Sequence, residues 1–236
     1  MSINSTSYSA PRPPEQPYDN QPPSTASLSR KKRGVAFPAD LWPQHSTIKI
    51  SLIGMTPEQE QFTKNNINKW APHVNLTFEF THQPDADIRI AVDKNPYGGS
   101  SAVGVAAKNT PAPKPTMFIG FANGDTRKAA QTVQHEFGHA LGLKHEHQHP
   151  YSALDFNKEN VYSDYENHGQ TRQEADANVF RKFDPRQTYY SQYDQHSIMH
   201  YGLPREFFNN NTPTPENYEL SETDKQFISA LYPKNP

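Results

Sequence analysis

Three histidines, one glutamate and one glycine stand at spacings that could build a metal site. They are His135, Glu136, His139, Gly142 and His145, in the order H-E-x-x-H-x-x-G-x-x-H. Residues four apart in a helix lie on one face, so His135 and His139 can reach the same metal ion. Gly142 can adopt a positive φ and end the helix, which lets the chain bring His145 back as a third ligand. Three protein ligands and one open position are typical of a catalytic zinc site.

Glu136 lies next to the first histidine, where its carboxylate can take a proton from a metal-bound water. Zinc lowers the pKa of such a water toward neutrality and polarises a scissile carbonyl. We interpret Glu136 as a general base, and later as the acid that protonates the leaving amine. The alternative is a group of surface histidines at a helix end. That alternative leaves the matched positions of the glutamate, the glycine and the third histidine unexplained.

The motif should lie on an amphipathic helix. Asp125 or Thr126 can cap its start. Its apolar residues recur at helical spacing, and they are Ala130, Val133, Phe137, Ala140 and Leu141. The two histidines and Glu136 project from the other side. We therefore expect a helix whose apolar stripe is buried and whose chemical face is free.

Alternating apolar and polar residues predict four strands before this helix, at 48–52, 74–80, 88–92 and 116–121. A Thr-Pro-Glu-Gln sequence at 56–59 has the residues of a capping box and begins a helix that should run to about Trp70. Gly98 to Ser101 are interpreted as a turn or a bulge. The predicted order is strand, helix, three strands and the metal-binding helix.

The chain after the motif is polar and less regular. Residues 146–196 are rich in Tyr, Asn, Gln and Asp and should form loops, with one short helix near 174–182. Ser221 should cap a C-terminal helix through Asp224, and Pro233 should end it.

Composition limits the other functions open to the chain. Its 236 residues suffice for one domain with a substantial core. A net charge of −2 gives no basic field for nucleic acid, and the absence of cysteine restricts metal ligands to His, Asp, Glu or Tyr. No apolar run is long enough to span a membrane, and the first residues lack the apolar core of a signal peptide. We expect a cytoplasmic protein or one exported by a non-classical route.

The first 34 residues differ in composition from the rest. They are polar and rich in proline, with few large aliphatic residues, so they should form a disordered tail or a pro-segment before a catalytic domain at 35–236. The tail ends in the basic run 30–33. This run could be a solvated group of charges, a proteolytic processing site or a nuclear address.

Two segments of the chain resemble the astacin-like metzincin zinc peptidases. The first is His135 to Glu146, where a glutamate after the third histidine is the astacin-type residue. The second is the sequence Ser-Ile-Met-His-Tyr at 197–201, which is similar to the astacin Met-turn and places Met199 about 54 residues after His145. The general likeness covers about 36–236. Many astacins carry disulfides, whereas this chain cannot form any.

The resemblance implies an α+β fold of the metzincin (zincin-like) type. The upper subdomain would hold a twisted mixed sheet and two long helices, and an irregular lower subdomain would end in a C-terminal helix. It also implies a zinc-dependent endopeptidase that binds one catalytic Zn²⁺ and hydrolyses protein or peptide substrates through a zinc-bound water activated by Glu136. We expect a monomer.

The resemblance also assigns residues outside the zinc ligands. Met199 would form a packed floor under the metal. Tyr201 would bind zinc at rest and then swing out to donate to the oxyanion. Glu146 would meet a new N-terminus released by cleavage near Arg33 and Gly34.

Astacin-like peptidases align their substrates along an antiparallel edge strand, as an added strand. The fourth predicted strand is our expectation for this role. Its substrate-binding residues would be Thr116, Met117, Phe118, Ile119 and Gly120.

Three other functions stay open. A zinc-containing module could capture peptides without turnover, although the presence of Glu136 argues against it. A gluzincin peptidase would use a distant glutamate as third ligand in place of His145. An interaction protein could instead act through the basic run 30–33.

Overall fold

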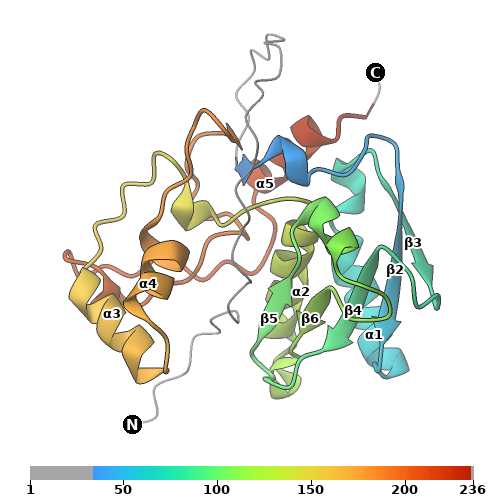
Figure 1. The fold of residues 1–236 in the computed structure, drawn as a ribbon, viewed down its shortest axis with the longest axis horizontal. Helices are drawn as coiled ribbons and strands as arrows, with labels where there is room; N and C mark the ends of the chain where they lie inside the picture. Colours follow the sequence, from blue (N-terminus) through green and yellow to red (C-terminus); the bar gives the residue numbers. More distant parts are fainter. Residues whose placement is uncertain (1–33, 235–236) are drawn as a thin grey trace.

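A five-stranded mixed sheet, ordered β3-β2-β4-β6-β5, forms the frame on which the metal-binding motif is built (Figure 1). The computed structural model describes residues 34–234, so the predictions for the tail and the basic run lie outside the described residues. Neighbouring strands are parallel except at β5, which pairs antiparallel with β6 at the sheet edge. The strand bounds are β2 Thr47–Ile53, β3 Thr77–Thr81, β4 Ile88–Val92, β5 Gly99–Ser101 and β6 Met117–Ile119.

Two long helices accompany the sheet. Helix α1 is Pro57–Ile67, and Thr56 and Gln59 form the expected capping box at its start. It is shorter than predicted, because the chain passes into a 3-10 turn at Ala71–His73. Helix α2 is Thr126–Ala140; it packs on β5, β6 and α1.

Strand β5 corrects the expected location of the edge strand. Gly98 to Ser101 carry no apolar alternation, yet Gly99–Ser101 form the antiparallel edge, because small residues let this strand pass close to α2. A Cβ at Gly99 would lie 2.7 Å from Thr132 Cγ2 and 2.8 Å from Glu136 Oε1. Apolar alternation marks a strand that buries the side chains of one face. Strand β5 instead packs its backbone against α2, so it needs no such pattern.

The prediction that 116–120 is the substrate-aligning edge is therefore wrong. Strand β6 lies between β4 and β5 and is paired on both sides. The flanking amides are also used: Thr116 N donates to Arg89 O, and Gly120 N donates to Gly98 O, each at 2.8 Å. No row of free backbone groups is left at Thr116, Met117, Phe118, Ile119 and Gly120 for an added strand.

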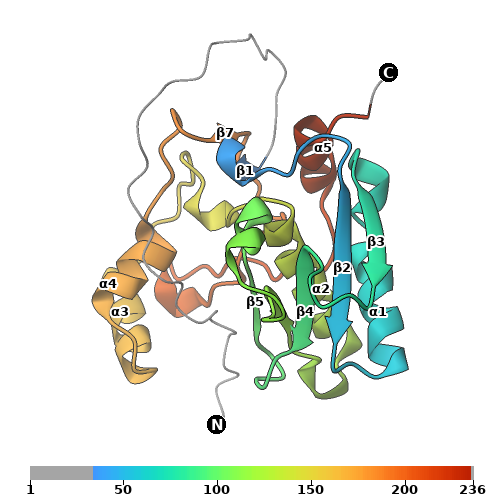
Figure 2. The ribbon, with the colours of Figure 1, turned by 45° about the vertical axis from the view of Figure 1, so that its right-hand side comes forward.

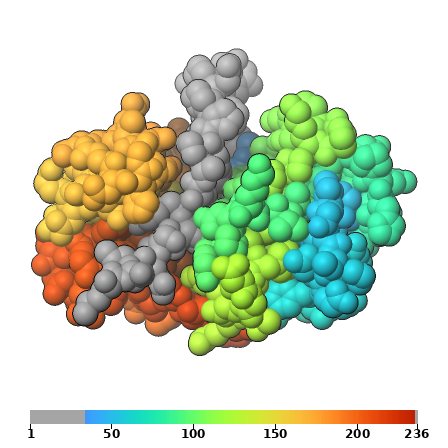
Figure 3. Space-filling model, turned by 90° about the horizontal axis from the view of Figure 1, so that it is seen from below, coloured from blue at the N-terminus to red at the C-terminus, as the bar shows by residue number. Residues whose placement is uncertain are grey.

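A second lobe holds α3, Lys158–Asn167, and α4, Arg172–Ala175, which continues into a π-helical turn at Asp176–Phe180. The predicted short helix near 174–182 corresponds to α4 and this turn. Helix α3 was not predicted, because Val161 and Tyr165 are its only buried residues. This lobe and the sheet lie at opposite sides of the molecule in the view from below (Figure 3).

The C-terminal helix α5, Glu222–Leu231, packs on the lobe that contains the sheet (Figure 2). Ser221 and Asp224 form its capping box, as predicted. Just after the helix, the hydroxyl of buried Tyr232 donates to Leu141 O at 2.7 Å, which ties the chain end to the end of α2. A short antiparallel pair, β1 Val35–Ala36 with β7 Tyr189–Tyr190, joins the start of the described chain to the second lobe.

Short turns connect these elements. The 3-10 turns besides Ala71–His73 are Pro38–Asp40, Gly104–Asn109, Ala122–Gly124, Glu146–Gln148 and Arg205–Phe207. Within 34–234, none of the helices has the length and hydropathy that a bilayer crossing requires.

Candidate metal centre

Helix α2 positions two of the histidines and Glu136. Asp125 caps the helix, as predicted, by accepting hydrogen bonds from Arg127 N and Lys128 N. The chemical face is not free, however: His135, Glu136 and His139 are only 8, 4 and 3% exposed. Neighbours distant in sequence, among them β5 and the turn at 197–201, cover this face.

Gly142 ends α2 in the way that the sequence predicts. Its φ is 100°, in the left-handed region that favours glycine. Leu143 N then donates to Gly138 O at 3.0 Å and Gly142 N donates to His139 O at 2.8 Å. These two bonds form a Schellman motif, which turns the chain back on the helix end. The turn carries His145 to the two helical histidines.

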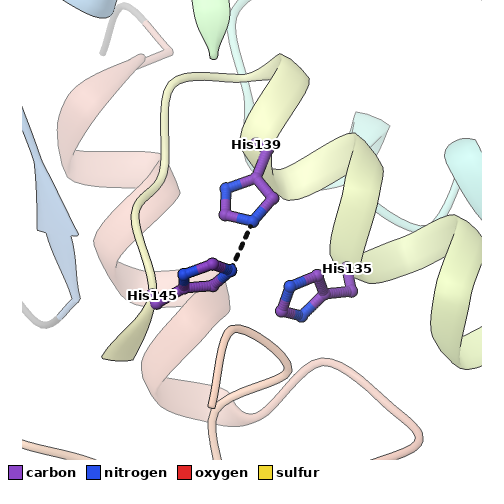
Figure 4. Close-up of side chains that lie close together, drawn as sticks. All are labelled: His135, His139 and His145. Carbon is purple, nitrogen blue, oxygen red and sulfur yellow. Dashed lines mark hydrogen bonds between the residues drawn. The ribbon is translucent and has the colours of Figure 1, made fainter. Parts of the chain in front are cut away.

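The three histidines converge as predicted. Figure 4 shows their rings turned toward one another, with His135 and His139 on α2 and His145 on the following loop. One ring nitrogen from each lies within 4.8 Å of the others, and this is the only such group found among residues 34–234. His139 Nε2 and His145 Nε2 are 2.9 Å apart. A tetrahedral zinc with ordinary Zn–N bonds would separate its nitrogens by roughly 3.3 Å, so a small outward shift accommodates the ion.

Hydrogen bonds prepare two of these rings for a metal ion. His135 Nδ1 donates to Ile198 O at 2.7 Å, and His139 Nδ1 donates to Leu143 O at 2.8 Å. Because a carbonyl can only accept, each Nδ1 carries the proton and each Nε2 presents a lone pair. His135 Nε2 is buried and has no hydrogen-bond partner in the described structure. Burial lowers the pKa of His135 to about 4, which keeps this ring neutral, as a metal ligand must be. The donor set therefore fits zinc.

Met199 and Tyr201 lie at the site, although they are more than fifty residues away in sequence. Met199 is buried, and its sulfur occupies the space that a side chain at Gly138 would need, so it packs directly against the metal-binding helix. The Tyr201 ring lies 5.6 Å from the His135 ring at an interplanar angle of 20°, and 4.3 Å from the His145 ring. Both residues thus lie beside the three histidines, and their roles stay predictions.

The remaining histidines of the region form hydrogen bonds. His147 is buried; its Nε2 donates to Asn178 O at 2.8 Å, and its ring stacks on Tyr201 with centroids 4.7 Å apart. Burial lowers the pKa of His147 to about 3, so it is neutral as well. His200 donates from Nδ1 to Tyr201 O and accepts at Nε2 from Tyr193, each at 2.7 Å.

Glu146 is fully buried behind the site. Its Oε1 accepts from Asp194 N at 2.9 Å, whereas its Oε2 has no partner within the described residues. Burial raises the pKa of Glu146 well above its usual range. The strand at 35–36 runs beside this loop, with Ala36 opposite Leu143 and Lys144 N donating to Val35 O.

Sequence reasoning missed two residues that contact the site. Gly99 was assigned to a turn, and nothing in its neighbours indicates that it faces Glu136. Asp224 was assigned only to a helix cap, yet its carboxylate also accepts from Ile198 N in the turn below the metal ligands. The capping sequence found Asp224, but only the fold brings it to the site.

Comparisons with known proteins agree with this geometry. The family model for astacin, a family of peptidases, matches residues 34–225. One structure of myroilysin has 35% sequence identity, covers 86% of this chain and 100% of its own, and superposes with a TM-score of 0.81. A crystal structure of myroilysin gives 33% identity, 84 and 87% coverage and a TM-score of 0.65.

A more distant structure shares the fold. High choriolytic enzyme 1, a hatching-enzyme zinc protease from Oryzias latipes (medaka fish), has 20% identity, 82% coverage of this chain and 94% of its own, and a TM-score of 0.56. A search of the curated proteins returned no match. The family match spans the sheet, α2, the third histidine and the Met-turn. The chain, whose three histidines gather around one point, belongs to the astacin family of peptidases and is a zinc-dependent endopeptidase.

Proposed function

We propose that Glu136 and Tyr201 carry out peptide hydrolysis at the three-histidine centre, with the substrate lying along β5. The convergence of His135, His139 and His145 beside Glu136 carries this proposal. When bound, a zinc ion supplies Lewis acidity, which lowers the pKa of a water and polarises a carbonyl. The protein side chains must then move the protons and hold the substrate.

Glu136 is the proton carrier. It is buried between α2 and β5, where the strand backbone passes within contact of its carboxylate. The same carboxyl group then protonates the leaving amine.

Tyr201 is the oxyanion donor. Its ring lies against His135 and His145 and is backed by His147. The hydroxyl is therefore carried on a packed ring at the metal centre, where it can donate a hydrogen bond to the charge that develops on the substrate oxygen.

Strand β5 aligns the substrate. It is the antiparallel edge of the sheet, and its Gly99 contacts Glu136. A peptide added to this edge would pass the general base with its backbone held by main-chain hydrogen bonds.

Cleavage near Arg33 and Gly34 is a further part of the proposal. The antiparallel register of Ala36 with Leu143 leads Gly34 toward the loop of Glu146, whose Oε2 is buried without a partner in the described structure. The Gly34 nitrogen donates to Ser191 Oγ in the described structure, and after cleavage we expect the new ammonium group to turn to this carboxylate. N-terminal sequencing of the active protein tests the idea, and full activity with an intact residue 1 or 2 contradicts it.

Quenched peptides test the proposed function as a whole. The zinc-loaded chain should cleave internal bonds, lose activity with a chelator and recover it when zinc is added back. Light scattering during the assay would check our proposal that one chain, which contributes every site residue named here, acts as a monomer. Hydrolysis that persists after zinc removal would overturn the proposal.

A further inference from the structure

The Asp224 carboxylate lies in the first turn of α5 and is 3% exposed. Three neutral donors surround it. Oδ1 accepts from the Ser197 hydroxyl at 2.6 Å, and Oδ2 accepts from Ile198 N at 2.8 Å and Ser221 N at 2.9 Å. A buried carboxylate held only by neutral donors is costly, because no opposite charge in direct contact offsets its desolvation.

A chain of hydrogen bonds leads from Asp224 through Ser197 to the metal centre. Ser197 Oγ donates to Asp224 and accepts from Met199 N at 3.0 Å. That N–H belongs to the peptide unit whose carbonyl is Ile198 O, and Ile198 O accepts from His135 Nδ1 at 2.7 Å. Every donor in the chain points toward Asp224. Hydrogen bonds aligned in this way polarise one another.

His139 offers an internal comparison. Its Nδ1 donates to Leu143 O at 2.8 Å, and the N–H of that same peptide unit, on Lys144, donates to Val35 O at 2.8 Å. The His139 chain therefore passes to a neutral backbone carbonyl, whereas the His135 chain passes to a carboxylate. The two ligands share one helix and the same tautomer, but their hydrogen-bond chains end at different groups.

We propose that Asp224 is a positioning residue that acts on His135 through Ser197 and the Ile198–Met199 peptide, and thereby strengthens zinc binding. The carboxylate draws the Ser197 proton toward itself, which makes Ile198 O a stronger acceptor for His135 Nδ1–H. The His135 ring becomes more electron-rich, and its Nε2 becomes a better zinc ligand. The bond from Ile198 N holds the turn so that Ile198 O stays in line with His135.

Asp224→Asn and Ser197→Ala break the relay at two different points. Asparagine can keep an oxygen toward Ile198 N and Ser221 N but removes the charge. Alanine at 197 removes the hydroxyl link but leaves Asp224 its two backbone donors. Outer-shell changes of this kind typically weaken metal binding by about 10- to 100-fold, and we expect about tenfold for each variant at this distance from the ion.

Ser221→Ala is the matched control. Ser221 caps the same helix, accepts from Asp224 N at 3.0 Å and donates to Asp194, but it is not in the relay. It should lower thermal stability and leave the zinc dissociation constant unchanged. The double variant Asp224→Asn/Ser197→Ala should bind zinc no more weakly than either single variant, because both interrupt the same chain.

The measurements are zinc affinity by chelator competition and the imidazole Nδ1–H resonances of the zinc-loaded protein by NMR. Asp224→Asn should move the His135 proton upfield and leave the His139 proton in place. Zinc affinities within twofold of the wild type for both relay variants would overturn the proposal. Equal shifts of the two imidazole protons, or the same loss of affinity in Ser221→Ala, would show general loosening of the site and would also overturn it.

Discussion

The two sides of the metal centre are built by different means. Helix α2 supplies His135, Glu136 and His139 from five consecutive positions, and regular helix hydrogen bonds hold them. His145 and Tyr201 come from loop backbone instead. Their positions depend on a Schellman turn, ring stacking and buried hydrogen bonds between segments far apart in sequence. The helical side is determined locally, whereas the loop side is determined by long-range contacts.

The apolar cores of the two lobes differ in the same way. The sheet and α2 share one large cluster, which also takes in Met199 of the turn and Phe227 of α5. The second lobe has a smaller cluster around Val161 and Phe208. Met199 is thus anchored in the larger core together with α5, whereas Tyr201 packs against the smaller cluster of the second lobe. Helix α5 supports the metal centre indirectly, because Asp224 holds the turn at 197–198.

Glu136→Gln tests the helical side most strongly. The amide cannot accept the proton, and general acid–base catalysis contributes about 10²- to 10⁴-fold to rate. We expect kcat to fall by that amount while the zinc content stays at one ion per chain, because Glu136 is not a ligand. Steady-state kinetics with metal analysis checks this. Near wild-type turnover in this variant would show that Glu136 is not the general base.

Tyr201→Phe tests the loop side. The ring packing against the histidines stays, but the hydroxyl donor is lost. Removing one oxyanion donor typically lowers kcat by about 10²-fold or more. We expect a fall at the lower end of that range with a small change in KM, measured on the same quenched peptides. An unchanged kcat would show that the Tyr201 hydroxyl takes no part in catalysis.

The pH dependence of the unfolding free energy tests Asp224, the α5 residue that connects the turn at 197–198 to the helical ligand His135. Burial raises the pKa of Asp224 to about 6 from 3.8, so the folded chain binds this proton more tightly than the unfolded chain does. The ionised carboxylate therefore lowers stability fully above pH 6, and this penalty disappears as pH falls toward 4. Asparagine has no such penalty. The unfolding free energy of Asp224→Asn relative to wild type should thus rise by up to about 3 kcal/mol between pH 4 and 7.

Denaturant unfolding of both proteins in the presence of a chelator measures this difference. Asp194 and Glu146 are the acids whose charges bear on Asp224, and both are present in the two proteins, so the proteins differ only at position 224. A difference that stays constant with pH would mean that Asp224 titrates normally.

Gly99→Ala tests the contact between β5 and α2 with the smallest expected effect. The new methyl group would lie 2.8 Å from Glu136 Oε1 and must displace it. We expect kcat/KM to fall by about tenfold, since small displacements of a reacting group reduce rate sharply. Gly54→Ala is the control for lost stability, because nothing lies within 4 Å of its Cβ position but its φ of 67° favours glycine. Equal activity of the two variants would show that the contact between β5 and Glu136 does not affect catalysis.

Local patterns predicted much of the fold. Asp125 caps α2, Thr56 and Ser221 cap α1 and α5, and Gly142 ends α2 with a positive φ, because these effects depend on residues within one turn of each other. Strand β5 escaped prediction because it carries no apolar alternation. Helix α3 escaped because it buries few residues. The proposed role of β6 was wrong because strand order in a sheet is a long-range property.

The sequence by itself determined the three-histidine set, the position of Glu136 beside it and the place where the helix ends. His135 and His139 are about one helical turn apart, and the Gly142 turn that brings His145 to them needs only backbone freedom. Only the tertiary structure decided that Gly99 faces Glu136 and that Asp224 connects through Ser197 to His135. These contacts join segments separated by tens of residues. They form when the sheet, α2 and α5 bury a common core, which no local pattern encodes.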